Sequence, residues 1–296
     1  GGIKVNVSNN HFEGNYYGIR VGGSASSTAE KITDLTIENN TIEAWGTSYN
    51  YGIYLGYVNA PTTARAKVQN NMIALNTTST TGTLYGIYPY HCANVDMFHN
   101  SIAANGGSLT NSRLIYLNHS SSSSYFTPGG NSLKNNIVAN LNGGMTMIVQ
   151  SAAAAGAPAY FTSDNNLFYS SNTASFNYGG TAMNDSVWQV ITSQDSNSVV
   201  GGDPMFVNPL NDLHVMGPGA DNTGTPLGLT TDIDGDTRST TTPDIGADEY
   251  TYTPMCFAPT GVTTFNVSSS YFYFNFNTVN SAIEFEARAA QTGTQN

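Results

Sequence analysis

The stretch Val68-Gln69-Asn70-Asn71-Met72-Ile73 decides the fold, because the same pattern recurs along the chain. In this pattern an Asn-Asn pair stands between two apolar residues, with one further residue on each side of the pair. The other copies are Val7–Phe12, Ile37–Ile42, Met97–Ile102 with His99 in the first Asn position, Leu133–Val138 and the less regular Thr162–Phe168. The second Asn falls at residues 10, 40, 71, 100, 136 and 166, so the steps are 30, 31, 29, 36 and 30 residues. A nearly constant step of this length is typical of solenoid repeats.

A second motif lies between the Asn-Asn pairs. Tyr17-Gly18-Ile19, Tyr51-Gly52-Ile53 and Tyr85-Gly86-Ile87 follow one another at intervals of 34 residues, and Arg113–Leu117 and Met145–Val149 take the same place in later repeats. Each repeat therefore carries short stretches with the period-2 alternation of β-strands, separated by polar turns. Ser186–Ile191 is the one stretch with the pattern of a short helix.

Elementary packing explains why such a motif repeats. A coil of three short strands cannot bury its inner face alone, but coils stacked at about 4.8 Å pair each strand with its neighbours above and below. Asn tolerates the left-handed backbone conformation of a sharp corner, and stacked Asn side chains can hydrogen-bond along the axis. We expect the Gly of Tyr-Gly-Ile to relax a corner before the next strand.

These features predict an all-β fold, a right-handed parallel β-helix of about six regular coils with a C-terminal cap. Leucine-rich repeats are the main rival solenoid, but their Leu spacing is not seen. Propellers are disfavoured because they need longer repeats with four strands each.

The composition excludes several classes of partner. The 296 residues carry 9 Lys and Arg against 20 Asp and Glu, a formal net charge of −11, so neither nucleic acid nor an anionic membrane surface is expected. Charged residues are 10% of the chain against about 25% in average globular domains, which suits secreted β-proteins better than helical enzymes. No apolar run approaches the roughly 20 residues of a membrane span. The chain opens Gly-Gly-Ile without Met or a signal peptide, so we expect a mature or excised fragment.

Beyond about residue 170 the repeat stops and other motifs follow. They are the strand-like Asp203–Val207 and Leu213–Val215, then Asp232-Ile233-Asp234-Gly235-Asp236-Thr237-Arg238 and Pro243–Tyr250. A solenoid must cover its last apolar layer and its strand edges. We therefore predict that residues 1–250 are one β-helix domain, with residues of about 200–250 as its cap.

The Asn-Asn coils and these later motifs together resemble the right-handed β-helix repeat domains of bacterial surface proteins. Such domains are common in large secreted proteins of the Bacteroidota, often exported by the type IX route. The resemblance covers roughly residues 1–250, and it departs from the usual Gly-Ser-Pro-Ala-Ile-Asp at Gly217-Pro218-Gly219-Ala220-Asp221. It implies an extracellular or cell-surface location in a Gram-negative bacterium, and it says little about activity.

Residues 251–296 are predicted to be a linker and the N-terminal part of a second domain. The alternating Tyr271–Phe276 and Ala282–Ala287 are similar to the opening strands of a fibronectin type III domain, with Phe where its core Trp would stand. A sandwich of this class needs close to 100 residues, so we expect the natural protein to continue beyond this stretch. For the two cysteines we expect a buried thiol at Cys92 and no disulfide to Cys256, which could pair within the missing part.

The outward face of the Tyr-Gly-Ile strands is the predicted functional surface. If the Ile residues point inward, the residues after them form one outward column, Arg20, Tyr54, Tyr88, Tyr116 and Ile148. A neighbouring column holds Gly22, Gly56, Tyr90, Asn118 and Gln150, with Tyr57, His91 and His119 nearby. Exposed rings flanked by polar groups suit a glycan, because sugar faces stack on rings and hydroxyls take hydrogen bonds.

Stacked Tyr side chains can equally be a ladder that stabilises the coils, so both interpretations stay open. The candidate glycan-binding residues are Arg20, Tyr54, Tyr88, Tyr116, Tyr90 and His91.

Catalysis has weaker support. Enzymes with this fold include polysaccharide lyases and pectin hydrolases. In the coils, however, no carboxylates recur at one register beside another except Glu38 and Glu43, which flank a turn, and the hydrolase signatures Asn-Thr-Asp, Asp-Asp and His-Gly are absent. A lyase would need a basic residue beside an acidic Ca²⁺ cluster, and Arg20 and Lys134 have no such cluster near them in sequence.

Asp232, Asp234 and Asp236 suggest a Ca²⁺ site, since alternating carboxylates can converge on one cation. Against it, Thr237 and Pro243 stand where an EF-hand loop has Gly and Glu. The alternative is a salt-bridged loop around Arg238, with Asp244, Asp248 and Glu249 as its acidic partners. No other cofactor is expected.

The sequence therefore favours a non-enzymatic structural or adhesive module of a large secreted or cell-surface protein. A carbohydrate-binding β-helix that uses the Tyr column is the first alternative, and a polysaccharide lyase or glycoside hydrolase is the second. The expected partners are a surface glycan, other cell-surface proteins and the secretion machinery.

Overall fold

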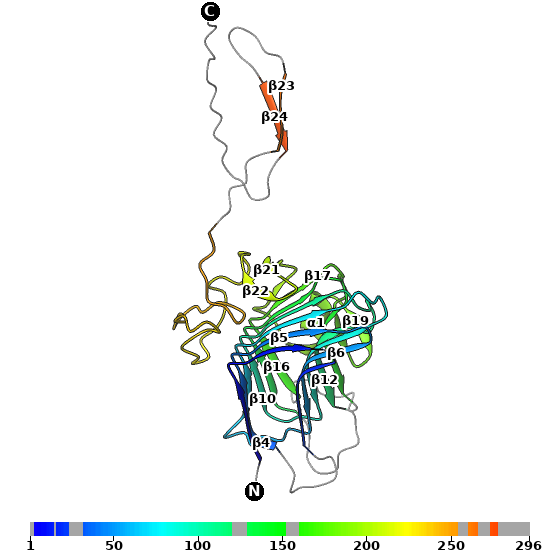
Figure 1. Ribbon diagram of the computed structural model, residues 1–296, viewed down its shortest axis with the longest axis vertical. Coiled ribbons are helices and arrows are strands. Elements are labelled where there is room, and N and C mark those ends of the chain that lie inside the picture. Colours follow the sequence, from blue (N-terminus) through cyan, green and yellow to red (C-terminus); the bar gives the residue numbers. More distant parts are fainter. Residues whose placement is uncertain are drawn as a thin grey trace, which may run out of the picture. The chain divides into compact units, whose positions relative to one another are not determined.

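The computed structural model describes residues 3–14, 16–23, 32–119, 129–151, 160–253, 260–265 and 273–277. The chain divides into two compact units, Gly1–Tyr252 and Thr253–Asn296. The first unit is a solenoid of short parallel strands stacked in three sheets (Figure 1). In the described part of the second unit, β23 (Thr260–Phe265) pairs antiparallel with β24 (Tyr273–Asn277). Cys256 and Ala282–Ala287 lie outside the described residues, and the likeness to fibronectin type III stays a prediction.

Each of six successive coils contributes one strand to each sheet. The first sheet holds β1 (Ile3–Ser8), β4 (Ile32–Glu38), β7 (Ala66–Gln69), β10 (Val95–Phe98), β13 (Asn131–Lys134) and β16 (Phe161–Asp164). The second holds β2 (His11–Gly14), β5 (Thr41–Trp45), β8 (Met72–Asn76), β11 (Ser101–Asn105), β14 (Ile137–Asn140), β17 (Leu167–Ser170) and β20 (Val199–Val200). The third holds β3 (Tyr17–Gly22), β6 (Tyr49–Gly56), β9 (Thr83–Tyr90), β12 (Arg113–His119), β15 (Met145–Ser151), β18 (Phe176–Tyr178) and β19 (Thr181–Met183). The predicted all-β parallel solenoid is confirmed.

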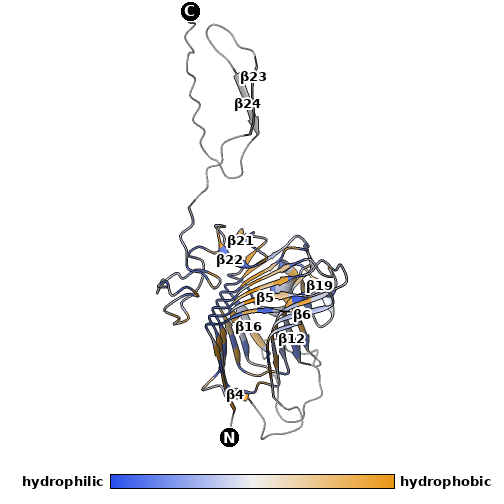
Figure 2. Ribbon diagram, in the orientation of Figure 1, coloured by the Kyte–Doolittle hydropathy of each residue, from blue (hydrophilic) through white to orange (hydrophobic). Residues whose placement is uncertain are grey.

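The core runs through the middle of the stack, where the inner faces of the three sheets meet. Val68 of the first sheet, Ile73 of the second and Ile87 of the third are all fully buried in it. Hydrophobic residues recur along the strands of every coil (Figure 2). Cys92 is a buried free thiol of this core, as predicted, and burial raises its pKa to about 12.

The two residues of each Asn-Asn pair have different tasks. The first forms the corner between the first and second sheets, where its φ lies between 53° and 57°, in the left-handed region. These corner residues are Asn9, Asn39, Asn70, His99, Asn135 and Asn165. Asn is the side chain that adopts this conformation at least cost after Gly, which is why it recurs here.

The second residue points inward and forms a ladder along the axis. The Nδ2 of Asn10, Asn40, Asn71, Asn100 and Asn136 each donates to the Oδ1 of the Asn in the next coil, at 2.9–3.0 Å. The backbone N–H of the same residues donates to the same oxygen, at 2.9–3.2 Å. The amides from Asn40 onward are thereby satisfied although they are buried, which removes the cost of polar groups inside the core.

The Gly of the Tyr-Gly-Ile motif was expected to relax a corner, and this expectation is wrong. Gly18, Gly52 and Gly86 do not have the positive φ that only Gly adopts easily. They are required for space, because a Cβ on Gly52 would lie 2.3 Å from Ile73 Cγ2 and 2.7 Å from the carbonyl oxygen of Gly86. The motif therefore marks where the third sheet approaches the second most closely.

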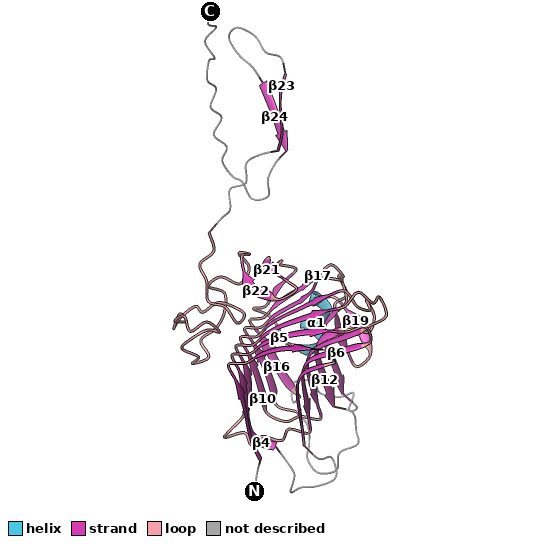
Figure 3. Ribbon diagram, in the orientation of Figure 1, coloured by secondary structure: helices cyan, strands magenta, loops and turns pink. Residues whose placement is uncertain are grey.

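A short helix closes the end of the stack. In α1 (Asp185–Thr192), which lies within the cyan element of Figure 3, the Asn184 side chain caps the N-terminus by accepting from the Val187 N–H. The buried Trp188 ring stacks on Phe176, with a centroid separation of 5.0 Å. Asp195 ends the Asn ladder, since its carboxylate accepts from Asn166 Nδ2 at 3.3 Å and from Trp188 Nε1 at 2.8 Å.

Residues 203–250, called the lateral segment below, lie along the side of the coils rather than over this last layer. The hairpin of β21 (Phe206–Asn208) and β22 (Asp212–Val215) and the later Ile245 and Ala247 bury the outer face of the second sheet. Asn135 Nδ2 donates to the Thr225 carbonyl and Asn70 Nδ2 to the Thr231 carbonyl. The segment, distant in sequence from these coils, thus joins the third coil to the fifth.

The Asn ladder predicts that the two residues of an Asn-Asn pair differ sharply in how much stability is lost when each is replaced. Asn71→Ala should lower the free energy of unfolding by about 3 kcal/mol, because it removes several buried hydrogen bonds, among them those from the backbone N–H and Nδ2 of Asn40 and the one to Asn100 Oδ1. Asn39→Gly should change it by less than about 1 kcal/mol, since Gly adopts the corner conformation freely. Urea denaturation measures the free energy of unfolding of both variants. Equal losses would contradict the assignment of the second Asn to the ladder and the first to the corner.

The close packing around the Gly of the Tyr-Gly-Ile motif predicts that two Gly-to-Ala substitutions in the third sheet differ in their effect on stability. Gly52→Ala should cost about 2–3 kcal/mol, because the added methyl group meets a core side chain and backbone. Gly22→Ala is the matched control in the same sheet, where no atom of the described residues lies within 4 Å of an added Cβ. Its effect should stay below about 0.5 kcal/mol. Thermal unfolding followed by circular dichroism distinguishes the two, and similar melting temperatures would contradict the steric argument.

Candidate functional site

The register of the third sheet places the predicted outward columns as expected. Arg20 pairs with Tyr54 and Tyr54 with Tyr88, while Tyr116 pairs with Ile148. The preceding Ile19, Ile53, Ile87, Ile115 and Met147 are buried in the core. The second column is also continuous, because Gly56 pairs with Tyr90 and Tyr90 with Asn118. The sequence thus located this surface, which we call the Tyr face.

A third column, which the sequence analysis did not consider, completes the Tyr face. Tyr17, Tyr51 and Tyr85 lie in register on the outer side, and Arg113 follows them. Tyr51 is stacked between its two neighbours, with ring centroids 4.6 Å from Tyr17 and 4.6 Å from Tyr85. The Arg113 guanidinium lies 4.6 Å from the centroid of the Tyr116 ring. The rings of the face are therefore covered mainly by one another.

The column of candidate residues is packed in the same way. The Tyr88 ring lies 5.3 Å from that of Tyr54 and 4.6 Å from that of Tyr116, which is 4% exposed. Asn118 Nδ2 donates to the Tyr88 hydroxyl at 3.0 Å, and the Tyr116 hydroxyl donates to Gln150 Oε1. Burial raises the pKa of Tyr54 to about 12 and that of Tyr88 further still. These hydroxyls are neutral hydrogen-bonding groups of the face.

His91 and Tyr90 lie at the end of the β9 strand. His91 is 1% exposed and adopts a φ of 50°, and its ring lies 4.6 Å from that of Tyr90 and 5.5 Å from that of Tyr57. Burial lowers its pKa, which favours the neutral imidazole at neutral pH. Arg20, by contrast, is exposed and lies 5.6 Å from both the Tyr17 and Tyr54 rings. Of the six candidate residues, it is the most accessible.

The structure gives the three carboxylates of the predicted Ca²⁺ site different partners. Asp232 is buried, and its two oxygens accept from the backbone N–H groups of Asp234, Asp236 and Glu249. Its role is to fold the loop, while Asp236 is exposed. Arg238 is buried as expected of the salt-bridged alternative, and its guanidinium binds Glu249 at 3.0 Å and Asn70 Oδ1 at 3.1 Å.

Asp234 instead belongs to a cluster that sequence reasoning missed. His214 contacts Asp212 through Nδ1 at 2.5 Å and Asp234 through Nε2 at 2.7 Å. Asp248 has an oxygen within 4.8 Å of the other two ligand atoms, so His214, Asp234 and Asp248 are close enough together to hold a metal ion, and His11, Glu13 and Glu43 form a similar group. Burial alone would lower the pKa of His214, but the hydrogen bonds to Asp234 and Asp212 outweigh it and raise this pKa to about 9.

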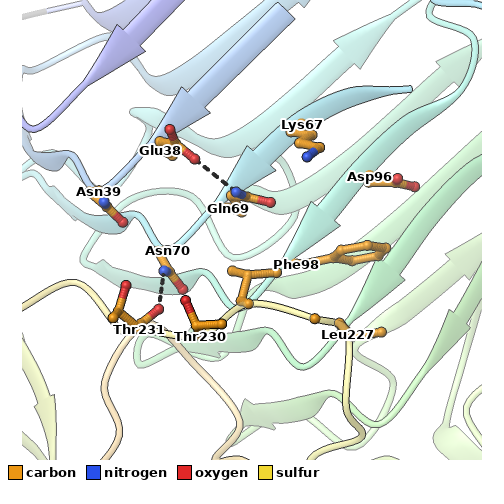
Figure 4. A pocket seen from close by; sticks show the side chains of 12 residues that line it. Glu38, Asn39, Lys67, Gln69, Asn70, Asp96, Phe98, Leu227, Thr230 and Thr231 are labelled. Carbon is orange, nitrogen blue, oxygen red and sulfur yellow. Dashed lines mark hydrogen bonds between the residues drawn. The ribbon is translucent and has the colours of Figure 1, made fainter. Parts of the chain in front are cut away.

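A groove opens on the outer face of the first sheet, where the sequence analysis did not look. Its volume is about 480 Å³, and it lies between the strands β4, β7 and β10 and residues 227–231 of the lateral segment (Figure 4). Glu38, Lys67 and Phe98 contribute side chains to it. In the sequence these residues are scattered over three coils, and nothing there shows that a distant segment forms the second wall.

Stacked coils in three parallel sheets, with a continuous row of inward Asn amides, define the molecule as a parallel β-solenoid. The family model for the right-handed β-helix region matches residues 1–195, and the chain belongs to this family. No curated protein and no solved structure matches the chain. Within the described residues, no helix is long and apolar enough to cross a membrane.

The His214 cluster predicts a pH-dependent stability. Because the pKa of His214 is raised by folding from about 6.5, its contribution is complete below pH 6.5 and disappears as the pH rises toward about 9. The wild type should be more stable than His214→Gln by about 1 kcal/mol at pH 6, a figure reduced for the partial exposure of this side chain, and equal to it near pH 9.5.

Urea denaturation at a series of pH values measures this difference. Asp236→Asn is the matched control, because it removes an exposed carboxylate of the same loop and leaves the described contacts of His214 intact. Its pH profile should follow the wild type. A His214→Gln difference that is constant from pH 6 to pH 9.5 would exclude the proposed linkage.

Proposed function

We propose that this domain is a rigid, non-enzymatic structural module of a secreted or cell-surface bacterial protein. The observation that carries the proposal is the Tyr face, whose rings stack on one another at 4.6 Å and whose hydroxyls bind Asn118 and Gln150. A face that served mainly to bind ligands would leave ring surfaces open. This one is built as a ladder that ties each coil to the next.

Two further features support a mechanical role. The Asn ladder is continuous from Asn10 to Asn166 and ends on Asp195. The lateral segment ties the third coil to the fifth through Asn70 and Asn135. Both connect repeats across the stack rather than within one coil, so they resist separation of the coils.

The carboxylates on the outer face of the first sheet are engaged in local contacts, which fits a non-enzymatic role. Glu38 accepts from Gln69 at 2.8 Å, Asp96 pairs with Arg65 at 2.7 Å and Asp164 accepts from Asn197 at 2.7 Å. A hydrolase would instead need two carboxylates directed at one sugar linkage. Glu13 and Glu43 of the second sheet lie in register, but Glu43 is engaged with His11 at 3.5 Å.

The proposal includes the setting inferred from the sequence resemblance. We place the domain in a large surface or secreted protein of the Bacteroidota type, exported by the type IX route, where it would space or present adhesive domains. The low content of charged side chains, 10% of the chain, fits an extracellular location. Its partners would then be other cell-surface proteins and the secretion machinery. Glycan binding by the Tyr column is the alternative tested next.

The triple variant Tyr54→Ala, Tyr88→Ala, Tyr116→Ala separates these two roles. A structural face predicts a loss of more than about 5 kcal/mol in the free energy of unfolding, because three packed rings are removed and each truncation of a packed ring costs roughly 3–5 kcal/mol when fully buried. The matched variant with Phe at all three positions keeps the rings and should lose less than about 2 kcal/mol. Thermal and urea denaturation measure both.

A glycan array on the same three proteins gives the second readout. If the Tyr column is structural, the Phe variant should show the glycan profile of the wild type. If the wild type binds a glycan, and the Phe variant loses that binding while its stability is retained, the column is a binding site and the structural interpretation of this face is wrong.

A further inference from the structure

The groove on the first sheet has two walls of different origin. Its floor is the outer face of β4, β7 and β10, and its other wall is the lateral segment at Leu227–Thr231 (Figure 4). The segment is held at both ends of this stretch, because Thr225 is bonded to Asn135 and Thr231 to Asn70. Its volume of about 480 Å³ lies within the 300–1,000 Å³ typical of small-molecule sites.

Phe98 is an unusual residue at this position. The outer column of the first sheet reads Ser8, Glu38, Gln69, Phe98, Lys134 and Asp164, so its other members are polar. The Phe98 side chain is half-buried, lines the groove, and belongs to neither of the two apolar clusters of the described residues. An aromatic ring set among polar groups in a groove is a surface on which a ligand can stack.

Several polar groups around this ring have hydrogen-bonding capacity that the described residues do not use. Lys67 lies beside Asp96 in the register, but Asp96 is paired with Arg65 at 2.7 Å, and Lys67 forms no ion pair within the described part of the chain. Asn39 Oδ1 is buried and has no hydrogen-bond partner there. A buried acceptor without a partner costs about 1–3 kcal/mol, so a ligand that donates to it gains affinity.

Asn39 differs from the corner residues Asn70 and Asn135 in the partner of its side-chain oxygen. The side-chain oxygens of Asn70 and Asn135 accept from Arg238 and from the Thr225 N–H of the lateral segment. Asn39 lies in the next coil along the row and lines the groove, and its buried Oδ1 has no such partner among the described residues. The groove thus begins where the segment leaves the corner row uncovered.

We propose that this groove binds a short stretch of a neutral oligosaccharide. The Phe98 ring would stack on the C–H face of one sugar, while Lys67 donates to hydroxyl oxygens and Glu38 accepts from hydroxyl hydrogens. The buried Asn39 Oδ1 would accept as well once its side chain turns into the groove. The opposite charges of Lys67 and Glu38 disfavour a polyanion, as does the net charge of −11. Phe98 and the two Leu residues offer too little apolar surface for a lipid or an apolar helix. This activity is separate from the structural role of the Tyr face and does not depend on it.

The test uses the full chain and an array of neutral tetrasaccharides of glucose, galactose, mannose and xylose, with oligogalacturonate as the charged comparison. Titration calorimetry with the best-binding tetrasaccharide then compares variants. Phe98→Ala and Lys67→Ala should each weaken binding by about tenfold, the loss expected for one stacked ring or one charge-assisted hydrogen bond.

Two matched controls keep the test specific. Lys134→Ala removes a Lys from the same outer face, and Tyr49→Ala removes an exposed ring from the third sheet; neither lines the groove. Both should bind like the wild type. Melting temperatures of all four variants within about 3 °C of the wild type would show that the fold is intact.

Several results would overturn the proposal. One is that no neutral tetrasaccharide binds. Another is that Phe98→Ala and Lys67→Ala both bind as tightly as the wild type. The third is that oligogalacturonate binds more tightly than any neutral probe. Should Phe98→Ala unfold, Lys67→Ala alone decides, because its side chain is exposed. Capture of an unstructured peptide but no saccharide by the groove would also replace the proposal with a different class of partner.

Discussion

The amide-to-amide hydrogen bond between consecutive coils is the interaction on which the rest of the structure depends. Each inward Asn donates to the next and accepts from the one before, so a buried polar row becomes self-satisfied only if the coils stay in one register. A shift of one residue would place an amide against apolar side chains and leave its hydrogen bonds unmade. The ladder therefore acts on the whole stack, and Asp195 with the α1 helix supplies the partner that its last amide needs.

The corner residues connect this interior row to the surface. Because the corner requires a left-handed backbone, Asn recurs there for a conformational reason, and its side chain is left on the outside. The lateral segment uses these outward amides as attachment points at Asn70 and Asn135. At Asn39 the segment makes no such attachment, a buried acceptor has no partner among the described residues, and the groove opens. Residues of the Asn-Asn motif thus contribute to the core, to the attachment of the lateral segment and to the candidate binding site.

Rings on the Tyr face and the ring in the groove show how the same residue type can serve opposite purposes. Tyr51 lies between two parallel rings that cover both of its faces, whereas Phe98 has polar neighbours in its column. Alternation along the strands placed Tyr54, Tyr88 and Tyr116 on the outer side, because register follows from the period of two, but it missed the outward column of Tyr17, Tyr51 and Tyr85. Whether an outward ring packs on its neighbours or stays open to a ligand depends on the side chains of adjacent coils, so periodicity alone left both interpretations open.

Local patterns in the sequence by themselves determined the solenoid, its coil length, the outward columns and the short helix, because stacking repeats must place equivalent residues in equivalent positions. The sequence also held a signal that the second sheet is covered on its outer face. Its strands β8, β11 and β14 carry few charges, which is typical of strands buried on both faces. Only the tertiary structure decided that residues 203–250 cover that outer face, that Asp232 folds a loop while Asp234 faces His214, and that a groove exists beside Phe98. These features arise from contacts between residues more than a hundred positions apart or from loop geometry without a repeat, and such contacts have no period that a sequence could display.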